Sequence, residues 1–365
     1  MPLRRIRPFF RLLLSAGGAL SLSACGVPFR YFPQAALGQL ELFNRARPIE
    51  EVLEDQRVPV RVRDLLREIP DVKKFGESRG LKPTSNYVEY VALDRPAVVW
   101  VVSASPPLRF EPKKWSFPIV GGFTYLGWFN REAALGYARE MGEAEGWDVD
   151  VRGASAYSTL GWFRDPVLST MIPEGVDSRG ELVNVILHES VHASFYIEHQ
   201  SAFNENIASF VADRLTREYF MRESPTRDSD QKTLRSWEES EARREKRQKK
   251  LHEGYITLEW LYAQTQLNDE EKKTQKKEIL DRLKRELGMP SERTLNNATL
   301  IQYRTYQSGQ AEWTEFFEQE CKRDWSTFWE KLEPLRAESG QWFSERQVED
   351  MGSVLRNLRS SDRSR

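Results

Sequence analysis

The sequence predicts an α+β fold in which a small mixed sheet is combined with many helices. Three observations support this fold class. First, β-branched and aromatic residues gather between residues 87 and 157, as they do in strands. Second, apolar residues recur with a helical period on both sides of that stretch. Third, residues 223–290 consist largely of Lys, Arg, Glu and Gln, which is typical of long solvated helices.

Charge and cysteine content exclude several classes of protein. The 54 basic and 55 acidic residues nearly cancel, so no global charge favours a nucleic-acid partner, and we expect none. Two cysteines are too few for a disulfide framework, a cysteine-rich zinc module or an iron-sulfur cluster. A metal site in this chain would therefore need histidine and carboxylate ligands, and the chain has only four histidines.

Residues 1–24 have the organisation of a secretory signal peptide. Four arginines precede an apolar stretch, Leu12–Ala24, and residues 1–24 contain no acidic residue. As a helix this stretch would rise about 20 Å, which is short of the ~30 Å hydrocarbon core of a bilayer. The stretch ends in Leu22-Ser23-Ala24-Cys25, which resembles a bacterial lipobox, so Cys25 is expected to carry lipid as the first residue of the mature chain.

Lipidation of Cys25 would anchor the protein in the bacterial cell envelope without a spanning helix. Because Gly26 rather than Asp follows the cysteine, the resemblance to sorted lipoproteins implies the outer membrane, with the protein facing the periplasm. The membrane is therefore an expected partner through the lipid on Cys25.

Before residue 157, changes in the period with which apolar residues recur predict the helices and strands. Helical periodicity covers residues 31–81, and strand, turn and strand are expected over 87–105, with Arg95-Pro96 at the turn. Aromatic and Gly-rich sequence continues over 115–129. Asn130 is expected to cap a helix that ends at Gly146, and a further strand is expected over 147–157.

Helices dominate the remainder. Ser178 to Glu181 has the form of a capping box and predicts a helix to about residue 196, and Asn204 is expected to cap the next one. Residues 223–290 predict a helical hairpin with solvated charges, the alternative being a hairpin that binds a protein partner. The resulting domain bounds are 1–24 for the signal peptide, 25–222 for an α+β core, 223–290 for the hairpin insert, 291–337 for C-terminal helices that complete the core, and 338–365 for a mostly flexible tail.

The helix from residue 178 contains His188-Glu189-Ser190-Val191-His192. Two histidines four residues apart project from one helical face and can hold one metal ion, and Glu189 beside them is placed to activate a water molecule. The alternative is a helix whose histidines only form hydrogen bonds in a core. The pattern predicts a zinc (Zn²⁺) site with His188 and His192 as ligands and Glu189 as general base.

A catalytic zinc site needs a third protein ligand and an open fourth position. Glu205 is the favoured candidate, because a helix, a short turn and an antiparallel helix would bring its first turn back across the histidines. His199 and Glu198 are the alternatives, although His199 does not have the spacing of the metzincins. The Glu205 arrangement resembles the gluzincins, thermolysin-like peptidases in which an Asn-Glu pair opening a later helix supplies the third ligand. This resemblance implies a gluzincin-like metallopeptidase core.

Further roles are assigned by position along the chain. Tyr306, or else Tyr303, is expected to donate a hydrogen bond to the oxyanion, unless both are ordinary core tyrosines. The stretch from Tyr157 to Phe163 is either a sheet edge that pairs with substrate or a core strand. An exopeptidase must also bind a free ammonium group, for which Asp165 and Glu198 are candidates.

Several motifs resemble the family of zinc aminopeptidases predicted in bacterial genomes as lipoproteins. They are the run from Val185 through Glu205, the block Ala156–Pro166, residues 45–49, residues 115–119 and Asn296-Asn297-Ala298. The chain departs from the family at Ser116, where Cys is frequent. The resemblance implies a lipid-anchored zinc aminopeptidase with a peptide or protein substrate. The alternatives are a zinc endopeptidase of envelope proteins and a non-enzymatic, metal-containing lipoprotein scaffold.

Overall fold

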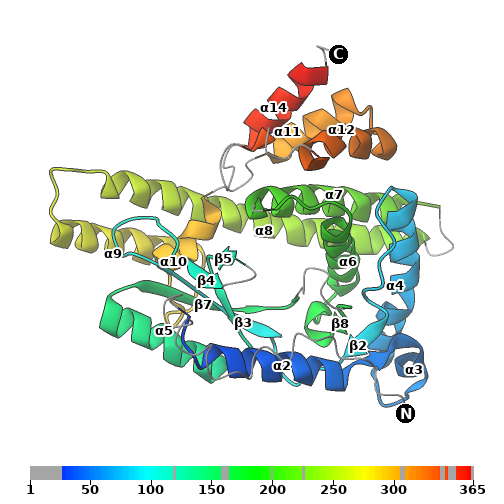
Figure 1. Ribbon diagram of the computed structural model, residues 1–365, viewed down its shortest axis with the longest axis horizontal. Coiled ribbons are helices and arrows are strands. Elements are labelled where there is room, and N and C mark those ends of the chain that lie inside the picture. The colour runs from blue at the N-terminus through cyan, green and yellow to red at the C-terminus, as the bar shows by residue number, and fades with distance from the viewer. Residues whose placement is uncertain are drawn as a thin grey trace. The chain divides into compact units, whose positions relative to one another are not determined.

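The computed structural model describes residues 27–117, 121–157, 164–198, 200–223, 227–304, 309–337, 342–343 and 351–362 (Figure 1). These residues form helices and small sheets, so the structure is mixed α and β. The chain divides into two compact units. The first unit takes residues 1–44, 99–154 and 254–301, and the second takes 45–98, 155–253 and 302–365. This division follows contacts in space, whereas the bounds predicted from sequence follow composition and stay a prediction.

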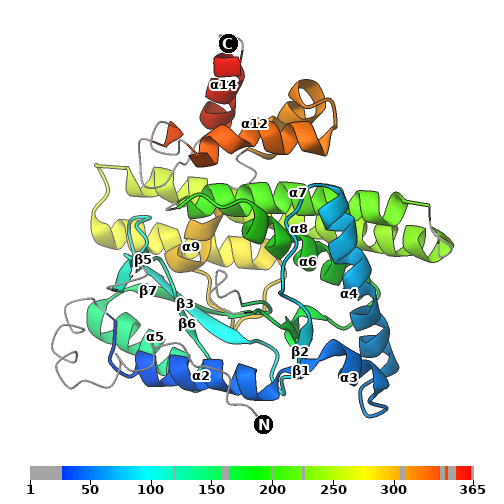
Figure 2. The ribbon, with the colours of Figure 1, turned by 45° about the vertical axis from the view of Figure 1, so that its right-hand side comes forward.

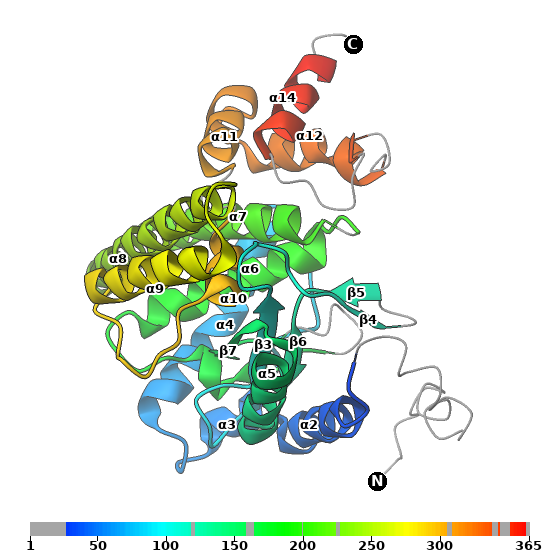
Figure 3. The ribbon, with the colours of Figure 1, turned by 90° about the vertical axis from the view of Figure 1, so that its left-hand side faces the viewer.

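The first unit is built on a three-stranded antiparallel sheet. Its central strand β3 (Val99–Ser105) pairs with β6 (Leu126–Trp128) and β7 (Asp148–Ala154), and strands β4 (Trp115–Phe117) and β5 (Gly121–Phe123) form a separate pair. Helices α2 (Tyr31–Arg45) and α5 (Arg131–Glu145) lie on one side of the sheet in Figure 3. Side chains from the sheet and α5 form a buried cluster that includes Val102, Trp128 and Met141.

The predicted bounds of α5 are confirmed, because local chemistry fixes both ends. Asn130 precedes the helix, and its Oδ1 accepts a hydrogen bond from the amide of Ala133 at 2.8 Å. Gly146 ends the helix with a φ of 70°, a left-handed conformation that glycine adopts without strain.

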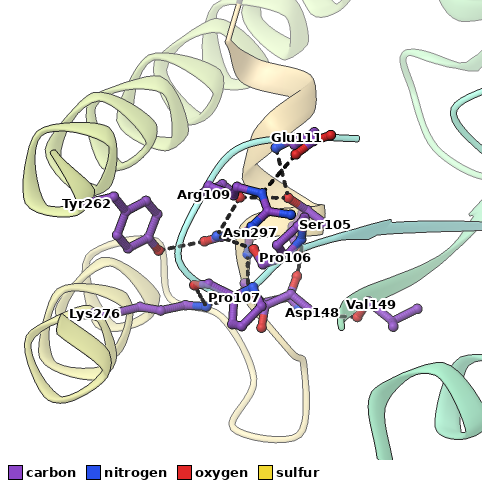
Figure 4. Close-up of polar contacts among 12 residues, drawn as sticks. Ser105, Pro106, Pro107, Arg109, Glu111, Asp148, Val149, Tyr262, Lys276 and Asn297 are labelled. Carbon is purple, nitrogen blue, oxygen red and sulfur yellow. Dashed lines mark hydrogen bonds and ion pairs between the residues drawn. The ribbon is translucent and has the colours of Figure 1, made fainter. Parts of the chain in front are cut away.

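A buried polar network connects residue 297 with the 105–111 loop, the start of β7 and two helices, as Figure 4 shows. The side chain of Asn297, at the start of α10 (Asn297–Leu300), is 0% exposed. Its Nδ2 donates to the carbonyl of Pro106 at 2.9 Å, and its Oδ1 accepts from the hydroxyl of Tyr262 at 2.7 Å. Asp148 accepts from the amide of Asn297 at 2.9 Å and from Lys276 at 2.5 Å. The Asn296-Asn297-Ala298 motif therefore ties the 105–111 loop to two helices.

Those two helices are the long charged ones. They are α8 (Arg227–Tyr262), which crosses the boundary between the two units, and α9 (Asp269–Glu286). Asn268 and Glu271 form a capping box at the start of α9. The predicted helices of the hairpin are thus present, with the turn between residues 262 and 269.

The second unit contains a small sheet of β1 (Arg47–Pro48), β2 (Glu89–Val91) and β8 (Val167–Leu168). Strands β2 and β3 therefore belong to different sheets, although residues 87–105 were expected as strand, turn and strand. Helices α3 (Ile49–Glu54), α4 (Val60–Ser78), α6 (Ser178–Ser194) and α7 (Ser201–Met221) complete this part, and Figure 2 shows α4, α6 and α7 together. Asp177 rather than Ser178 precedes α6, so the capping box expected there is not formed.

Aromatic side chains form the core of the C-terminal helices. The helices are α11 (Gln310–Glu315), a π-helical turn (Phe316–Glu320), α12 (Trp325–Ala337) and α14 (Met351–Asp362). Trp313, Phe316 and Phe328 are at most 1% exposed. Residues 351–362 fall in the predicted flexible tail, but they are helical with Leu355 buried, because their apolar residues share one helical face.

Among the residues that the structure describes, no helix combines the length and the apolar character that crossing a bilayer requires.

Candidate metal centre

Helices α6 and α7 pack as an antiparallel pair and carry the site. On α6, His188 and His192 lie one turn apart on the face toward α7, with side chains 19% and 13% exposed. The hydroxyls of Ser190 and Ser194 donate to the carbonyls of Ile186 and Ser190, so these buried polar groups are satisfied within the helix.

The turn between the helices sets the direction of Glu205. Asn204 is 1% exposed, and its side chain makes two hydrogen bonds with the backbone of Ile197 in the turn. Helix α7 begins at Ser201 with Gln200 at the cap position, four residues before the cap expected at Asn204, so Asn204 holds the turn rather than capping the helix. Glu205 is the fifth residue of α7 and lies opposite the histidines.

The three predicted ligands converge. His188 Nε2 lies 3.3 Å from one carboxylate oxygen of Glu205, and His192 Nε2 lies 3.5 Å from the other. The two Nε2 atoms are 3.2 Å apart. One ligand atom from each residue lies within 4.8 Å of the others, so the group could hold a metal ion. Glu205 is 62% exposed, which leaves the cluster open on one side.

Charge interactions within the cluster are strong. Burial acts to raise the pKa of Glu205, but hydrogen bonds and charge from His188 and His192 outweigh it and hold the pKa well below its usual range. Burial acts to lower the pKa of His188, and Glu205 outweighs it and raises the pKa. Nδ1 of His192 is buried without a hydrogen-bond partner in the described structure.

Glu189 lies next to the cluster in a partly buried position. Burial raises its pKa, the charges of His188 and His192 lower it, and Asp165 adds to the increase. Asp165 is 3% exposed. Three carboxylates, of Glu189, Glu205 and Asp165, and two imidazoles therefore interact electrostatically at this end of α6.

Tyr87 interacts electrostatically with Glu189 and Asp165 and lies in a loop with a strained backbone. Its φ is 63°, a conformation that is rare for a bulky residue, and it is 4% exposed. Its amide donates to the carbonyl of Asp165 at 2.8 Å. Burial raises the pKa of its phenol well above the usual value, and the charges of Glu189 and Asp165 add to the increase.

A polar contact behind His188 joins the two helices. Nδ2 of Asn184, one turn before His188, donates to Oδ1 of Asp213 on α7 at 3.0 Å and to Oγ1 of Thr216 at 3.3 Å. Burial raises the pKa of Asp213, and hydrogen bonding to Asn184 opposes that increase. The charge of Asp213 in turn acts to raise the pKa of His188.

Several residues proposed from sequence lie outside the described residues. They are Cys25, Tyr306, His199 and residues 158–163. Of the other candidates, Glu198 is exposed and interacts electrostatically with Tyr196. The backbone carbonyl of Tyr303 lies 2.8 Å from Nδ1 of His252.

Sequence reasoning missed Tyr87, Asn184 and Asp213. Helical spacing could have indicated the last two, because Asn184 lies four residues before His188 and Asp213 lies eight residues after Glu205. Tyr87 carries no such signal, since its place depends on the 86–87 loop meeting Asp165.

Comparison with known proteins gives one match. The search found no match to this chain among curated proteins or among solved structures. A family described as "Putative aminopeptidase" matches residues 30–346, a span that includes all of the residues in the cluster. Because this match covers most of the sequence, the chain belongs to that family.

Proposed function

We propose that the protein is a metal-dependent peptidase whose metal ligands are His188, His192 and Glu205. The observation that carries the proposal is the convergence of two imidazole nitrogens and a carboxylate within 4.8 Å, beside the carboxylate of Glu189. The family description supports peptide hydrolysis as the reaction.

The spacing of the two imidazole nitrogens supports zinc as the metal. Around a tetrahedral ion with ligands at about 2.0–2.1 Å, neighbouring ligand atoms lie about 3.3–3.4 Å apart. The Nε2 atoms of His188 and His192 are 3.2 Å apart, and each lies within 3.5 Å of one of the two oxygens of Glu205. Two imidazoles and one carboxylate also leave a fourth position for substrate or water, as a catalytic site requires.

The residues divide the chemistry among them. A divalent ion held here would supply a Lewis acid that polarises the scissile carbonyl and acidifies water. Glu189 would accept the proton of the attacking water at its carboxylate and deliver it to the leaving amine. Burial of Glu189 favours its protonated form, which suits a group that must hold a proton between two steps.

We further propose that the enzyme is an aminopeptidase in which Asp165 binds the free ammonium group of the substrate. The charge of Asp165 acts on Glu189, so an ammonium group bound beside Glu189 would be attracted by Asp165 as well. Asp165→Asn should then raise KM for a substrate with a free N-terminus and change little for N-acetylated peptides. Equal effects on both substrates would exclude this role.

We also propose that the chain is a lipoprotein anchored through Cys25, because a lipobox-like segment follows a basic and apolar leader. The mass of the N-terminal peptide from membrane-extracted protein tests this directly.

The decisive experiment combines metal analysis with activity. The purified chain should contain about one zinc and hydrolyse leucine p-nitroanilide. Glu205→Ala should lose the metal, whereas Glu189→Gln should keep the metal and lose activity by ~10²–10⁴-fold. Glu198→Gln is the matched control, because it removes a nearby exposed acid and should keep both properties.

The other outcomes point to different functions. Cleavage of blocked peptides alone would indicate an endopeptidase. A folded, zinc-containing Glu189→Gln variant with unchanged turnover would indicate a metal-containing scaffold. A chain that binds no divalent ion would contradict the proposal altogether.

A further inference from the structure

Helix α2 packs on the rest of its unit through its first two residues, Tyr31 and Phe32, and through a face that continues along the helix. Oε1 of Gln34 accepts from the amide of Phe129 at 2.8 Å. One turn later, the ring of Phe129 covers Gly38 so closely that a Cβ there would lie 2.0 Å from a ring carbon. Leu42 follows one turn further on and is 2% exposed. After Tyr31 and Phe32, the inward face of α2 therefore consists of Gln34, Gly38 and Leu42.

The opposite face of α2 is apolar and exposed. Leu37 is 66% exposed and Leu40 is 48% exposed, and Pro33 and Ala36 on the same face are exposed as well. Phe29, two residues before the helix, is 66% exposed. A helix at a water interface normally has polar or charged side chains on its outer face. The outer face of α2, defined by these five residues, therefore fits an apolar environment.

The charge of the segment is also unusual. No Asp or Glu occurs before Glu41, and the first turn of α2 contains no acid. Nothing in this segment would repel the anionic headgroups of a bilayer.

The lipobox identifies the apolar environment. Five residues separate Cys25 from Tyr31, the first residue of α2, and even a fully extended chain of that length spans only about 20 Å. If Cys25 is acylated, α2 must begin within about that distance of the acyl chains. We propose that the outer face of α2 lies in the headgroup region of the membrane to which Cys25 is anchored. This inference rests on the lipid anchor of the proposed function.

A bilayer contact through α2 would have a physical consequence. One attachment point leaves a protein free to tumble, whereas a lipid together with an apolar helix face gives two contacts. Two contacts fix the orientation of the first unit at the membrane surface.

The test places a polarity-sensitive fluorophore on α2 of the full, acylated chain. Cys321 is 1% exposed and Cys25 is acylated, so Ala36→Cys supplies the accessible thiol among the described residues for an NBD label. The protein is reconstituted into phosphatidylethanolamine and phosphatidylglycerol vesicles. NBD emission should shift to the blue and rise severalfold, and lipids brominated on their acyl chains should quench it by about half or more.

Three controls make the result specific. A label at Trp260→Cys on α8, where the native side chain is 65% exposed, should be quenched by aqueous iodide and not by brominated lipid. Adding Leu37→Gln and Leu40→Gln to the α2-labelled chain should return its emission toward the aqueous value, whereas Ile256→Gln on α8 should not. All variants should hydrolyse a soluble reporter at the unmodified rate.

Three results would overturn the inference. A label at residue 36 that iodide quenches as strongly as the label at residue 260 would leave α2 in water. A blue shift that depends on protein concentration and occurs in detergent would identify a second copy of the chain as the partner. An N-terminal peptide without lipid would remove the anchor and the inference with it, and would be seen in the mass spectrum before any fluorescence is measured.

Discussion

The carboxamide of Asn204 is bonded to both backbone groups of Ile197. Its Oδ1 accepts from the amide of Ile197 at 2.9 Å, and its Nδ2 donates to the carbonyl of the same residue at 2.8 Å. Both residues are at most 2% exposed, so water cannot replace these bonds. Because Glu205 directly follows Asn204 in the chain, this contact helps to determine where a ligand of the proposed metal lies.

Asn204→Ala should weaken metal binding without removing any ligand. We expect about 10–100-fold lower zinc affinity, as is common for groups that orient ligands, and about 1–3 kcal/mol lower stability. Competition with a chromogenic chelator measures the affinity. Asn130→Ala is the control, since it removes the cap of α5 and should lower stability by ~1 kcal/mol while the zinc affinity stays the same. Normal zinc affinity in Asn204→Ala would mean that α7 positions Glu205 without this contact.

Tyr87→Phe should lower kcat while leaving the metal in place. The phenol of Tyr87 interacts electrostatically with Glu189 and Asp165, and the amide of Tyr87 donates to the carbonyl of Asp165 at 2.8 Å. Loss of its hydroxyl dipole should destabilise the ionised form of Glu189, and we expect roughly a tenfold lower kcat. Tyr90→Phe on the adjacent strand is the matched control. Equal kcat values for the two variants would assign Tyr87 a purely structural role.

Much of the fold could be predicted because many elements are specified locally. The cap at Asn130 and the left-handed Gly146 follow from residues next to the helix that they delimit. Strand partners are not local. Tyr90 on β2 pairs with Val167, which no period between residues 87 and 105 could reveal. Leu355 in the expected tail is buried through another non-local contact, because α14 packs against α11.

In the candidate site as well, features set by the local sequence could be predicted, and features set by contacts between distant residues could not. His188 and His192 share a face because of helix geometry alone, and Glu205 could be added because a short turn leaves α7 little choice of direction. Tyr87 could not be predicted, since a positive φ in tyrosine has no sequence signal and arises from its hydrogen bond to Asp165.

Glu241 should make stability depend on pH. Its side chain is 23% exposed, and burial raises its pKa to about 7, with Arg244 opposing and Asp213 and Glu181 adding to the increase. The folded state therefore binds this proton more tightly than the unfolded state. The stabilisation of the folded state by this proton is complete below the usual pKa of 4.5, and it is lost as the pH rises through about 7.

Glu241→Gln should abolish this dependence. We expect the variant to be more stable than the unmodified chain at pH 8, by about 1–3 kcal/mol, and to differ less at pH 5. Urea unfolding of the metal-free protein measures this, because metal binding is itself pH-dependent. Glu238→Gln removes an exposed carboxylate from the same helix and should not reproduce the effect. A variant less stable at pH 8 would show that the ion pair with Arg244 outweighs burial.

Asn297→Ala should destabilise the first unit more than its loss of size would suggest. The variant leaves the hydroxyl of Tyr262 and the carbonyl of Pro106 without their partner in a buried network, and we expect a loss of about 2–4 kcal/mol (Figure 4). Tyr262→Phe removes only one donor and should lose ~1 kcal/mol. Once Asn297 is alanine, Tyr262→Phe should cost less than it does alone, since the hydroxyl no longer has a partner to lose. Strictly additive losses in urea unfolding would mean that the two side chains do not depend on each other, and that the network is not the reason for the buried asparagine.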